Sequence, residues 1–188
     1  LEIDESNQYM LELLMKGFVL CNDAISQEGN VIGDPTEIAL IEFPKKFSYD
    51  ELEIRSENKR LSEIPFDSDR KLMSTVNQYK GKKIAFTKGA VDQLLERATK
   101  ILKNDEIIDI TPEDKVNIIN NMTLMSEKAL RVLSLGFKML PENSDYTLET
   151  LETEIIYVGM VGMIDPPRIE VRDSVLRAKS AGIDVKMI

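Results

Sequence analysis

Apolar residues recur along this chain in two spacings, which together predict a mixture of helices and strands. Spacing at every third or fourth residue, typical of one buried helix face, marks residues 6–22, 91–101, 112–129 and 170–180. Alternating or continuous apolar residues predict strands at 71–76, 84–87, 131–138, 155–164 and 183–188. Residues 52–65 have the pattern of an extended segment, and 141–154 that of an acidic loop or short helix.

Capping and turn residues indicate where several of these elements begin. Ser6 is a plausible N-cap for the first helix. Asp34 and Glu37 have the spacing of a capping box, with a proline between them at the first helical position. Thr111 precedes a proline in the same way. Gly81 lies in the turn that we expect to join the strands at 71–76 and 84–87 as a hairpin.

The order of these elements predicts an α+β fold in which helices flank an antiparallel β-sheet. The pattern of the last residues is different, because it predicts a strand, a helix and a second strand. This order is typical of a βαβ-like fragment of a parallel-sheet domain. The chain begins without a Met and stops inside the strand expected at 183–188. We therefore expect a piece of a longer protein, with a domain boundary near residues 160–164.

Composition and charge exclude several classes of function. The 188 residues are 43% hydrophobic and 30% charged, as in ordinary soluble domains. A formal charge of −9 disfavours nucleic acid and anionic membrane surfaces, although a local basic cluster can still bind one small anion. With no histidine and a single cysteine, the usual zinc ligand sets and a Cys–His nucleophile are ruled out. We expect Cys21 to be a small core residue.

Lys88 and Gly89 stand where a predicted strand ends and a predicted helix begins. Residues 84–87 have β-branched and aromatic character, and apolar residues from Val91 onward follow helical spacing. A lysine beside a glycine at such a junction offers an ammonium and free backbone N–H groups, which suit a phosphate. An ordinary turn with a solvated lysine is the simpler interpretation of this stretch alone.

Other polar stretches allow both a structural and a functional interpretation. Residues 33–37 suit a well-capped helix start. Phe66, in a polar turn, is either a core aromatic that anchors the hairpin or a ring that stacks on a purine, worth roughly 1–3 kcal/mol. Lys71 and Arg131 are single cations on predicted strands, where solvation is the simpler interpretation. Residues 165–168 follow a predicted buried strand. They form either a rigid turn or part of a binding site, because open α/β sheets place their sites where strands end.

These stretches occur in an order that resembles the large cytoplasmic segment of P-type cation-transporting ATPases, especially the calcium-pump-like members. The matching text spans nearly the whole chain in six blocks, at residues 20–23, 33–40, 66–73, 88–90, 130–133 and 158–168. A single Lys-Gly-Ala is weak, but the ordered set is specific. The resemblance implies a nucleotide-binding domain in residues 1–163 and part of a phosphorylation domain in 164–188.

The resemblance also implies a nucleotide site, with six binding residues: Glu37, Phe66, Lys71, Lys88, Gly89 and Arg131. In the family, the residue matching Phe66 stacks on adenine and the one matching Glu37 helps to recognise the base. The residue matching Lys88 lines the deep end of the pocket. Those matching Lys71 and Arg131 steer the ribose and phosphates. These roles suit the chemistry of ATP, with an apolar ring for the base, a carboxylate acceptor for the exocyclic amine and cations for the phosphates.

Two matches and several departures qualify the comparison with the family. Asp165 and Arg168 match the hinge between the two domains. Ser68 stands where animal calcium pumps carry an arginine that contacts the phosphates, so that contact is in doubt, and Val91 replaces a frequent proline. The sequence lacks the Asp-Lys-Thr-Gly-Thr block with the phosphorylated aspartate, the Thr-Gly-Glu block and the Gly-Asp-Gly block. We therefore expect no catalytic residue and no metal site in this chain.

Together these observations predict a chain that binds ATP and presents it to an aspartate in an adjacent domain. In the intact pump this would drive cation transport, calcium being the first choice, with Mg²⁺ as a cofactor. Its partners would be the phosphorylation and actuator domains of the same parent protein. The chain would act as a monomer at the cytoplasmic face of the membrane. It would contact neither the membrane nor nucleic acid. A kinase or ATPase acting alone would need a glycine-rich loop that is absent from the sequence; an interaction module without a ligand stays open.

Overall fold

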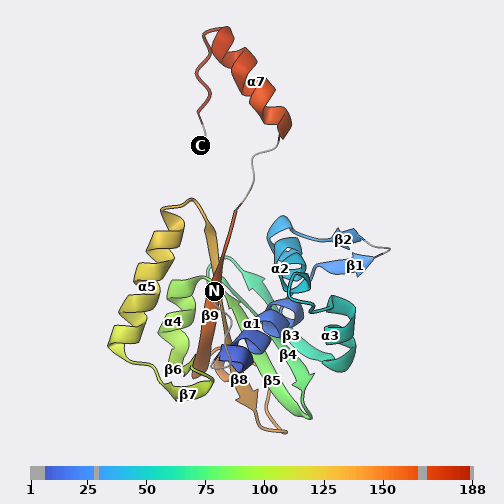
Figure 1. The fold of residues 1–188 in the computed structure, drawn as a ribbon. Coiled ribbons are helices and arrows are strands. Elements are labelled where there is room, and N and C mark those ends of the chain that lie inside the picture. The colour runs from blue at the N-terminus through green and yellow to red at the C-terminus, as the bar shows by residue number, and fades with distance from the viewer. Residues whose placement is uncertain (1–6, 28–29, 165–168, 187–188) are drawn as a thin grey trace.

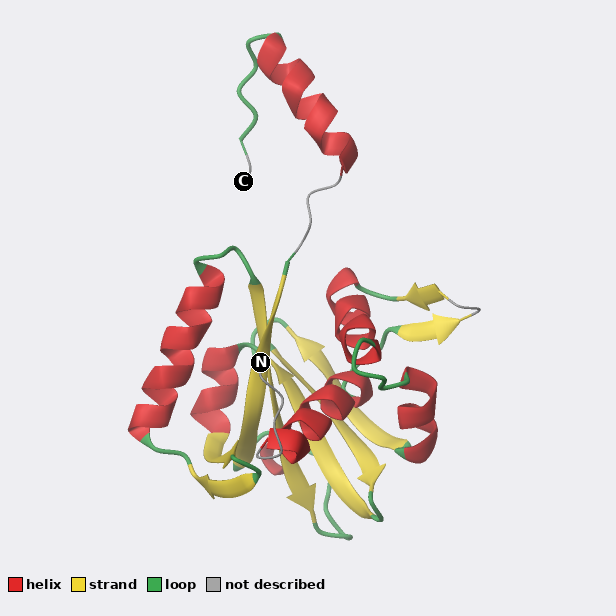
Figure 2. Ribbon diagram, viewed as in Figure 1, coloured by secondary structure: helices red, strands yellow, loops and turns green. Residues whose placement is uncertain are grey.

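The chain forms a mixed β-sheet with helices on both faces, beside a small two-stranded sheet (Figures 1 and 2). The structure is a computed structural model that describes residues 7–27, 30–164 and 169–186. In sequence order the helices are α1 (Gln8–Leu20), α2 (Pro35–Lys45), α3 (Glu51–Glu57), α4 (Val91–Arg97), α5 (Pro112–Ser126), α6 (Leu148–Leu151) and α7 (Ile169–Ser180). The α+β prediction is confirmed.

The main sheet has seven strands in the order β3-β4-β5-β8-β9-β6-β7. These strands are β3 (Arg60–Asp67), β4 (Leu72–Tyr79), β5 (Lys82–Gly89), β6 (Ala98–Lys103), β7 (Glu106–Asp109), β8 (Arg131–Leu140) and β9 (Ile155–Met163). Neighbours run antiparallel except for β6 and β9, which are parallel. The small sheet pairs β1 (Ile25–Gln27) with β2 (Asn30–Ile32).

Helices pack on both faces because the central strands are buried on both sides. On one face α1 crosses the strands, and a Cβ atom on Gly17 would come within 2.9 Å of the Phe86 ring (Figure 1). On the other face, a Cβ on Gly136 would lie 3.2 Å from the side chain of Leu94 in α4. Gly136 pairs with Thr87, the strand neighbour of Phe86, so the two contacts lie on opposite faces. Helices α2 and α3 adjoin α1.

Three predicted elements differ from the structure. Residues 52–65 were expected to be extended, but 51–57 form α3, because the Asp50 side chain caps the Glu53 N–H and Ile54 reaches the core. The helix expected at 91–101 ends at Arg97, since Ile101 pairs with strands on both sides as part of β6. Tertiary pairing has overridden the local helical pattern at residues 98–101. Lys71 lies in a turn, and not on a strand.

The C-terminal residues match the prediction only in part. The expected helix is present as α7, but residues 181–186 form neither helix nor strand. Most residues from 171 to 186 are exposed, and Figure 1 shows α7 standing away from the sheet. A strand requires a neighbour for its backbone hydrogen bonds, and none of the described strands pairs with this segment. Asp165 and Arg168 lie outside the described residues.

The N-terminus of α1 is capped by a residue from far along the chain. The carboxylate of Asp105, in the turn between β6 and β7, accepts hydrogen bonds from the N–H groups of Tyr9 and Met10, each at 2.9 Å. These are among the backbone donors that a helix cannot satisfy internally. Ser6, the predicted cap, lies outside the described residues. The distant turn thereby fixes the start of the helix that is followed by Asp23, a residue that lines the cavity described below.

We expect the Asp105→Ala substitution to lower the free energy of unfolding by about 1–2 kcal/mol, because two helix N–H groups lose a charged acceptor. Urea unfolding monitored by circular dichroism measures the change. Two controls are needed. Asp109→Ala removes an equal charge from an exposed position on β7, and Asn104→Ala places alanine at a neighbouring left-handed position, with φ of 50°, and leaves the cap intact. Equal losses in Asp105→Ala and in either control would contradict the capping role.

Candidate functional site

A cavity of about 530 Å³ opens beside the first turn of α2, at the ends of β3, β5 and β8. This volume lies in the range of small-molecule sites. The lining residues are Asp23, Asp34, Thr36, Glu37, Leu40, Phe66, Met73, Lys88, Gly89, Arg131 and Leu133. Elements from across residues 23–133 therefore meet at one place.

The cavity brings together most of the residues predicted for the nucleotide site. Five of the six line it, namely Glu37, Phe66, Lys88, Gly89 and Arg131. Lys71 is not part of the lining among the described residues. It is exposed in the turn between β3 and β4 with a φ of 55°, and its carbonyl accepts the Ala90 N–H at 3.1 Å. Its backbone thus supports the cavity wall at Gly89, while a role for its side chain stays a prediction.

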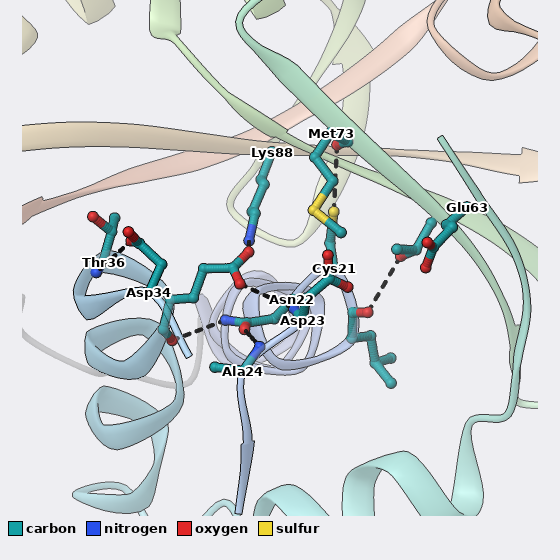
Figure 3. Close-up of polar contacts among 12 residues, drawn as sticks. Cys21, Asn22, Asp23, Ala24, Asp34, Thr36, Glu63, Met73 and Lys88 are labelled. Atoms are coloured by element: carbon teal, nitrogen blue, oxygen red, sulfur yellow. Dashed lines mark hydrogen bonds and ion pairs between the residues drawn. The ribbon is translucent and has the colours of Figure 1, made fainter. Parts of the chain in front are cut away.

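Lys88 is buried at the cavity wall, where it forms an ion pair with Glu37. Its Nζ lies 2.6 Å from Glu37 Oε1, and the residue is only 6% exposed (Figure 3). The second carboxylate oxygen accepts the Asp23 N–H at 3.2 Å. A buried ammonium is costly unless it is paired, so the carboxylate explains how a lysine is tolerated here. The interpretation of Lys88 as a solvated lysine is wrong.

The first turn of α2 delivers Glu37 to the cavity. Asp34 caps this helix as predicted, but the Glu37 carboxylate binds Lys88 and the Asp23 N–H and does not complete a capping box. The Asp34 carboxylate accepts the Thr36 N–H at 2.8 Å, and that hydrogen bond holds the pKa of Asp34 below its usual range. Proline occupies the first helical position. Arg131 donates from Nη1 to Thr36 Oγ1 at 2.6 Å, which joins the start of β8 to the start of α2.

The segment after α1 is held by Asn22 and Arg60. Asn22 donates from Nδ2 to the Glu37 carbonyl at 3.0 Å and accepts the Ala24 N–H at 2.9 Å (Figure 3). Arg60 donates to the carbonyls of Leu20 and Asn22 and to the Asp23 carboxylate, at 2.9, 2.6 and 2.8 Å. This segment supplies the N–H that holds Glu37, so its fixed position orients the ion pair.

Cys21 is a core residue, as predicted. It is fully buried, and its thiol donates to the Met73 carbonyl at 3.3 Å (Figure 3). Burial raises the pKa of the thiol. The protonated, inaccessible sulfur therefore ties α1 to β4 and has the environment of an inert structural cysteine.

The remaining lining residues give the cavity two chemical characters. Phe66 presents a ring that is 61% exposed, and Leu40, Met73 and Leu133 add apolar surface. Arg131 supplies positive charge, whereas the charge of Lys88 is balanced by Glu37, and the carboxylates of Asp23 and Asp34 also line the cavity. A ligand with a planar apolar part and an anionic part fits this combination. In the described part of the chain, no three Cys, Asp or Glu side chains gather as a metal site.

Gly89 allows the backbone of two strands to approach closely at the cavity wall. Its φ is +154°, and a Cβ atom built on it would lie 2.1 Å from the Lys71 carbonyl oxygen. No other residue type fits at that distance without moving the backbone. Close packing of the backbone therefore explains why position 89 is a glycine, whether or not a ligand binds.

Sequence reasoning missed several lining residues, although a signal for them was present. Leu40, Met73 and Leu133 each lie inside one of the matched motif blocks, but were not singled out because a lone apolar residue gives no functional pattern. Arg60 lies outside every block. Its contacts are to backbone carbonyls of a segment 38–40 residues away, which no local pattern reveals.

Comparison with known proteins assigns the family. The family model described as P-type ATPase, cytoplasmic domain N, matches residues 10–170. The chain belongs to this family. It is similar to proteins named calcium-transporting ATPase 1 from Bacillus cereus, with 46% identity over 182 residues, and from Lactococcus lactis, with 42% over 188. It also shares 37% identity over 183 residues with cation-transporting ATPase pma1 from Synechocystis.

These alignments cover 97%, 100% and 94% of the chain but only 20%, 21% and 20% of the three relatives. The chain therefore spans about a fifth of the length of the curated relatives it matches. The resemblance to P-type ATPases is confirmed. None of the described helices of this P-type ATPase domain has the length and apolar character needed to cross a membrane.

In this domain we expect Glu37→Gln to lower the free energy of unfolding by about 1–3 kcal/mol, because buried Lys88 loses its charged partner. The double variant Glu37→Gln/Lys88→Met should recover part of the loss. Urea unfolding of both variants measures the coupling. Glu42→Gln, which removes an exposed partner of Lys45 on the same helix, is the control. Identical effects of Glu37→Gln and Glu42→Gln would contradict a buried, interdependent pair.

Proposed function

We propose that this chain is the ATP-binding domain of a P-type cation pump. In this function it holds ATP and presents the γ-phosphate to an aspartate in an adjacent domain of the same parent protein. The observation that carries the proposal is one cavity that combines the exposed Phe66 ring with the cations of Lys88 and Arg131. Membership of the domain N family supports it.

The base would bind at the Phe66 end of the cavity. An exposed aromatic ring can stack on adenine and gains roughly 1–3 kcal/mol from doing so. The Glu37 carboxylate already accepts from Lys88 and from the Asp23 N–H. A carboxylate has about four acceptor positions, so Glu37 can also accept a hydrogen bond from the exocyclic amine of adenine. Lys88 then keeps that carboxylate correctly oriented.

The phosphates would be steered by positive groups on the rim. Arg131 lines the cavity and supplies a positive charge. The N-terminus of α2 is already capped by the Asp34 carboxylate, so we do not assign the phosphates to it. Lys71, on the neighbouring turn, is long enough to contribute a further ammonium, and Ser68 supplies no such charge. We assign the Mg²⁺ of the intact pump to the ATP phosphates and propose no metal site within this domain.

The parent pump would transport a cation, with calcium the first choice. Two of the relatives above are named calcium-transporting ATPases. We propose residues 1–163 as the nucleotide-binding domain and residues 164–188 as a segment of the phosphorylation domain, with Asp165 and Arg168 at the hinge. The exposure of residues 171–186 supports this division, since apolar side chains such as Leu176 lack a cover in the structure. The domain would act as a monomer at the cytoplasmic face, with the phosphorylation and actuator domains as partners.

We expect saturable ATP binding with a dissociation constant of roughly 0.1–1 mM, because one stacked ring and a few partly exposed charges offset little more than the entropy of association. Titration followed by amide chemical shifts measures it. Phe66→Ala and Lys88→Ala should each weaken binding at least about fivefold.

Matched controls separate the site from general damage to the fold. Lys82→Ala removes an exposed lysine from the far end of β5, and Phe47→Ala removes a partly exposed ring from outside the cavity lining. Both should bind ATP like the unaltered chain. No saturable binding by the unaltered chain, or unchanged affinity in both site variants, would refute the nucleotide site.

The isolated chain should not turn over ATP. Phosphoryl transfer needs a nucleophile and a metal-bound triphosphate, and the Asp-Lys-Thr-Gly-Thr block that carries the family's aspartate is absent from the sequence. Phosphate release from millimolar ATP and Mg²⁺ should equal that of a buffer blank. Steady release that scales with the concentration of the chain and is lost in Lys88→Ala would overturn the prediction.

A further inference from the structure

Glu152 is a buried carboxylate on the face of the sheet opposite the cavity. It caps the C-terminus of α6 and is only 3% exposed. It accepts from Arg70 Nη1 at 2.5 Å and from the Ser74 hydroxyl at 2.9 Å. Ser74 hydrogen-bonds in turn to Thr87 across the β4–β5 pair. Met73 and Lys88, each adjacent in sequence to one of these residues, line the cavity on the other face.

Arg70 links this buried carboxylate to the two residues that flank Phe66. Its Nη2 donates to the Pro65 carbonyl at 2.9 Å, and its Nε lies 3.9 Å from the Asp67 carboxylate. One guanidinium therefore touches the residue before the ring and the residue after it. The planar fork of arginine suits such a simultaneous contact, whereas a lysine ammonium does not.

Strand pairing supports the backbone at Phe66 only in part. β3 is an edge strand, paired only with β4 among the described strands. Its register is irregular between Ile64 and Asp67, and Pro65 has no N–H to donate. The ring itself is 61% exposed. The turn after Phe66 is also fixed locally, because the Asp67 carboxylate accepts the N–H groups of Asp69 and Arg70 and its carbonyl accepts the Lys71 N–H. The Arg70 guanidinium is the contact that joins both neighbours of Phe66 to the buried Glu152.

We propose that the Glu152–Arg70 pair is a positioning device for Phe66 that pre-orders the ring for stacking on the base. Neither residue lines the cavity. An anchored strand end lowers the ordering cost of binding, because the ring already points as the ligand requires. This inference rests on the ATP-binding function proposed above, and it adds a remote acidic residue that controls recognition of the base.

The test compares ATP, which carries a nucleobase, with inorganic tripolyphosphate, which carries none. In Glu152→Gln the dissociation constant for ATP should rise roughly three- to tenfold, because a poorly oriented ring loses part of the stacking free energy. The dissociation constant for inorganic tripolyphosphate should stay unchanged. Arg70→Lys keeps the charge but loses the simultaneous contacts, and it should behave the same way. In a Phe66→Ala background neither substitution should weaken ATP binding further, because the group being positioned is gone.

Glu154→Gln is the matched control, since it makes an identical change two residues away in an exposed ion pair with Lys138. It should leave both affinities unchanged. Equal weakening of ATP and tripolyphosphate, a further loss in the Phe66→Ala background, or unchanged ATP affinity in both Glu152→Gln and Arg70→Lys would overturn the positioning role. Absence of ATP binding by the unaltered chain would instead remove the proposed function, and this inference with it.

Discussion

The ion pair between Lys88 and Glu37 is the interaction on which the candidate site depends. It joins the end of a central strand to the first turn of α2, two elements that share no backbone hydrogen bond. Neither charge is stable in this position alone, because both side chains are largely withdrawn from water. The cap of α2, the Asn22 side chain and the Arg60 contacts all act to keep this pair in one geometry.

The alternation of side chains along β4 and β5 lets one pair of strands serve two purposes. On one face Met73 and Lys88 belong to the cavity. On the other face Ser74 and Thr87 connect to buried Glu152. Rigid strands transmit the position of one face to the other, so a polar network behind the sheet can support a binding surface in front of it. The ATP-binding function that we propose would gain from such pre-organisation.

Several features could be predicted from the sequence because their causes are local. The capped start of α2, the hairpin of β4 and β5 and the burial of Cys21 follow from spacing, turn residues and the lack of histidine. Five of the six predicted site residues meet in one cavity, because their motif blocks lie where strands and helices end. α3 was missed, since a seven-residue helix with one deeply buried apolar residue has too short a pattern to stand out.

What the sequence by itself determined is the family, the α+β fold class and several of the residues that line the candidate site. Only the tertiary structure decided that Lys88 is buried and paired, that the side chain of Lys71 lies outside the cavity lining, and that Arg60, Arg70 and Glu152 support the site. The physical reason is separation along the chain. Hydrogen bonds that join residues 38 to 82 positions apart leave no local pattern, and burial is a property of the packed fold and not of any short stretch.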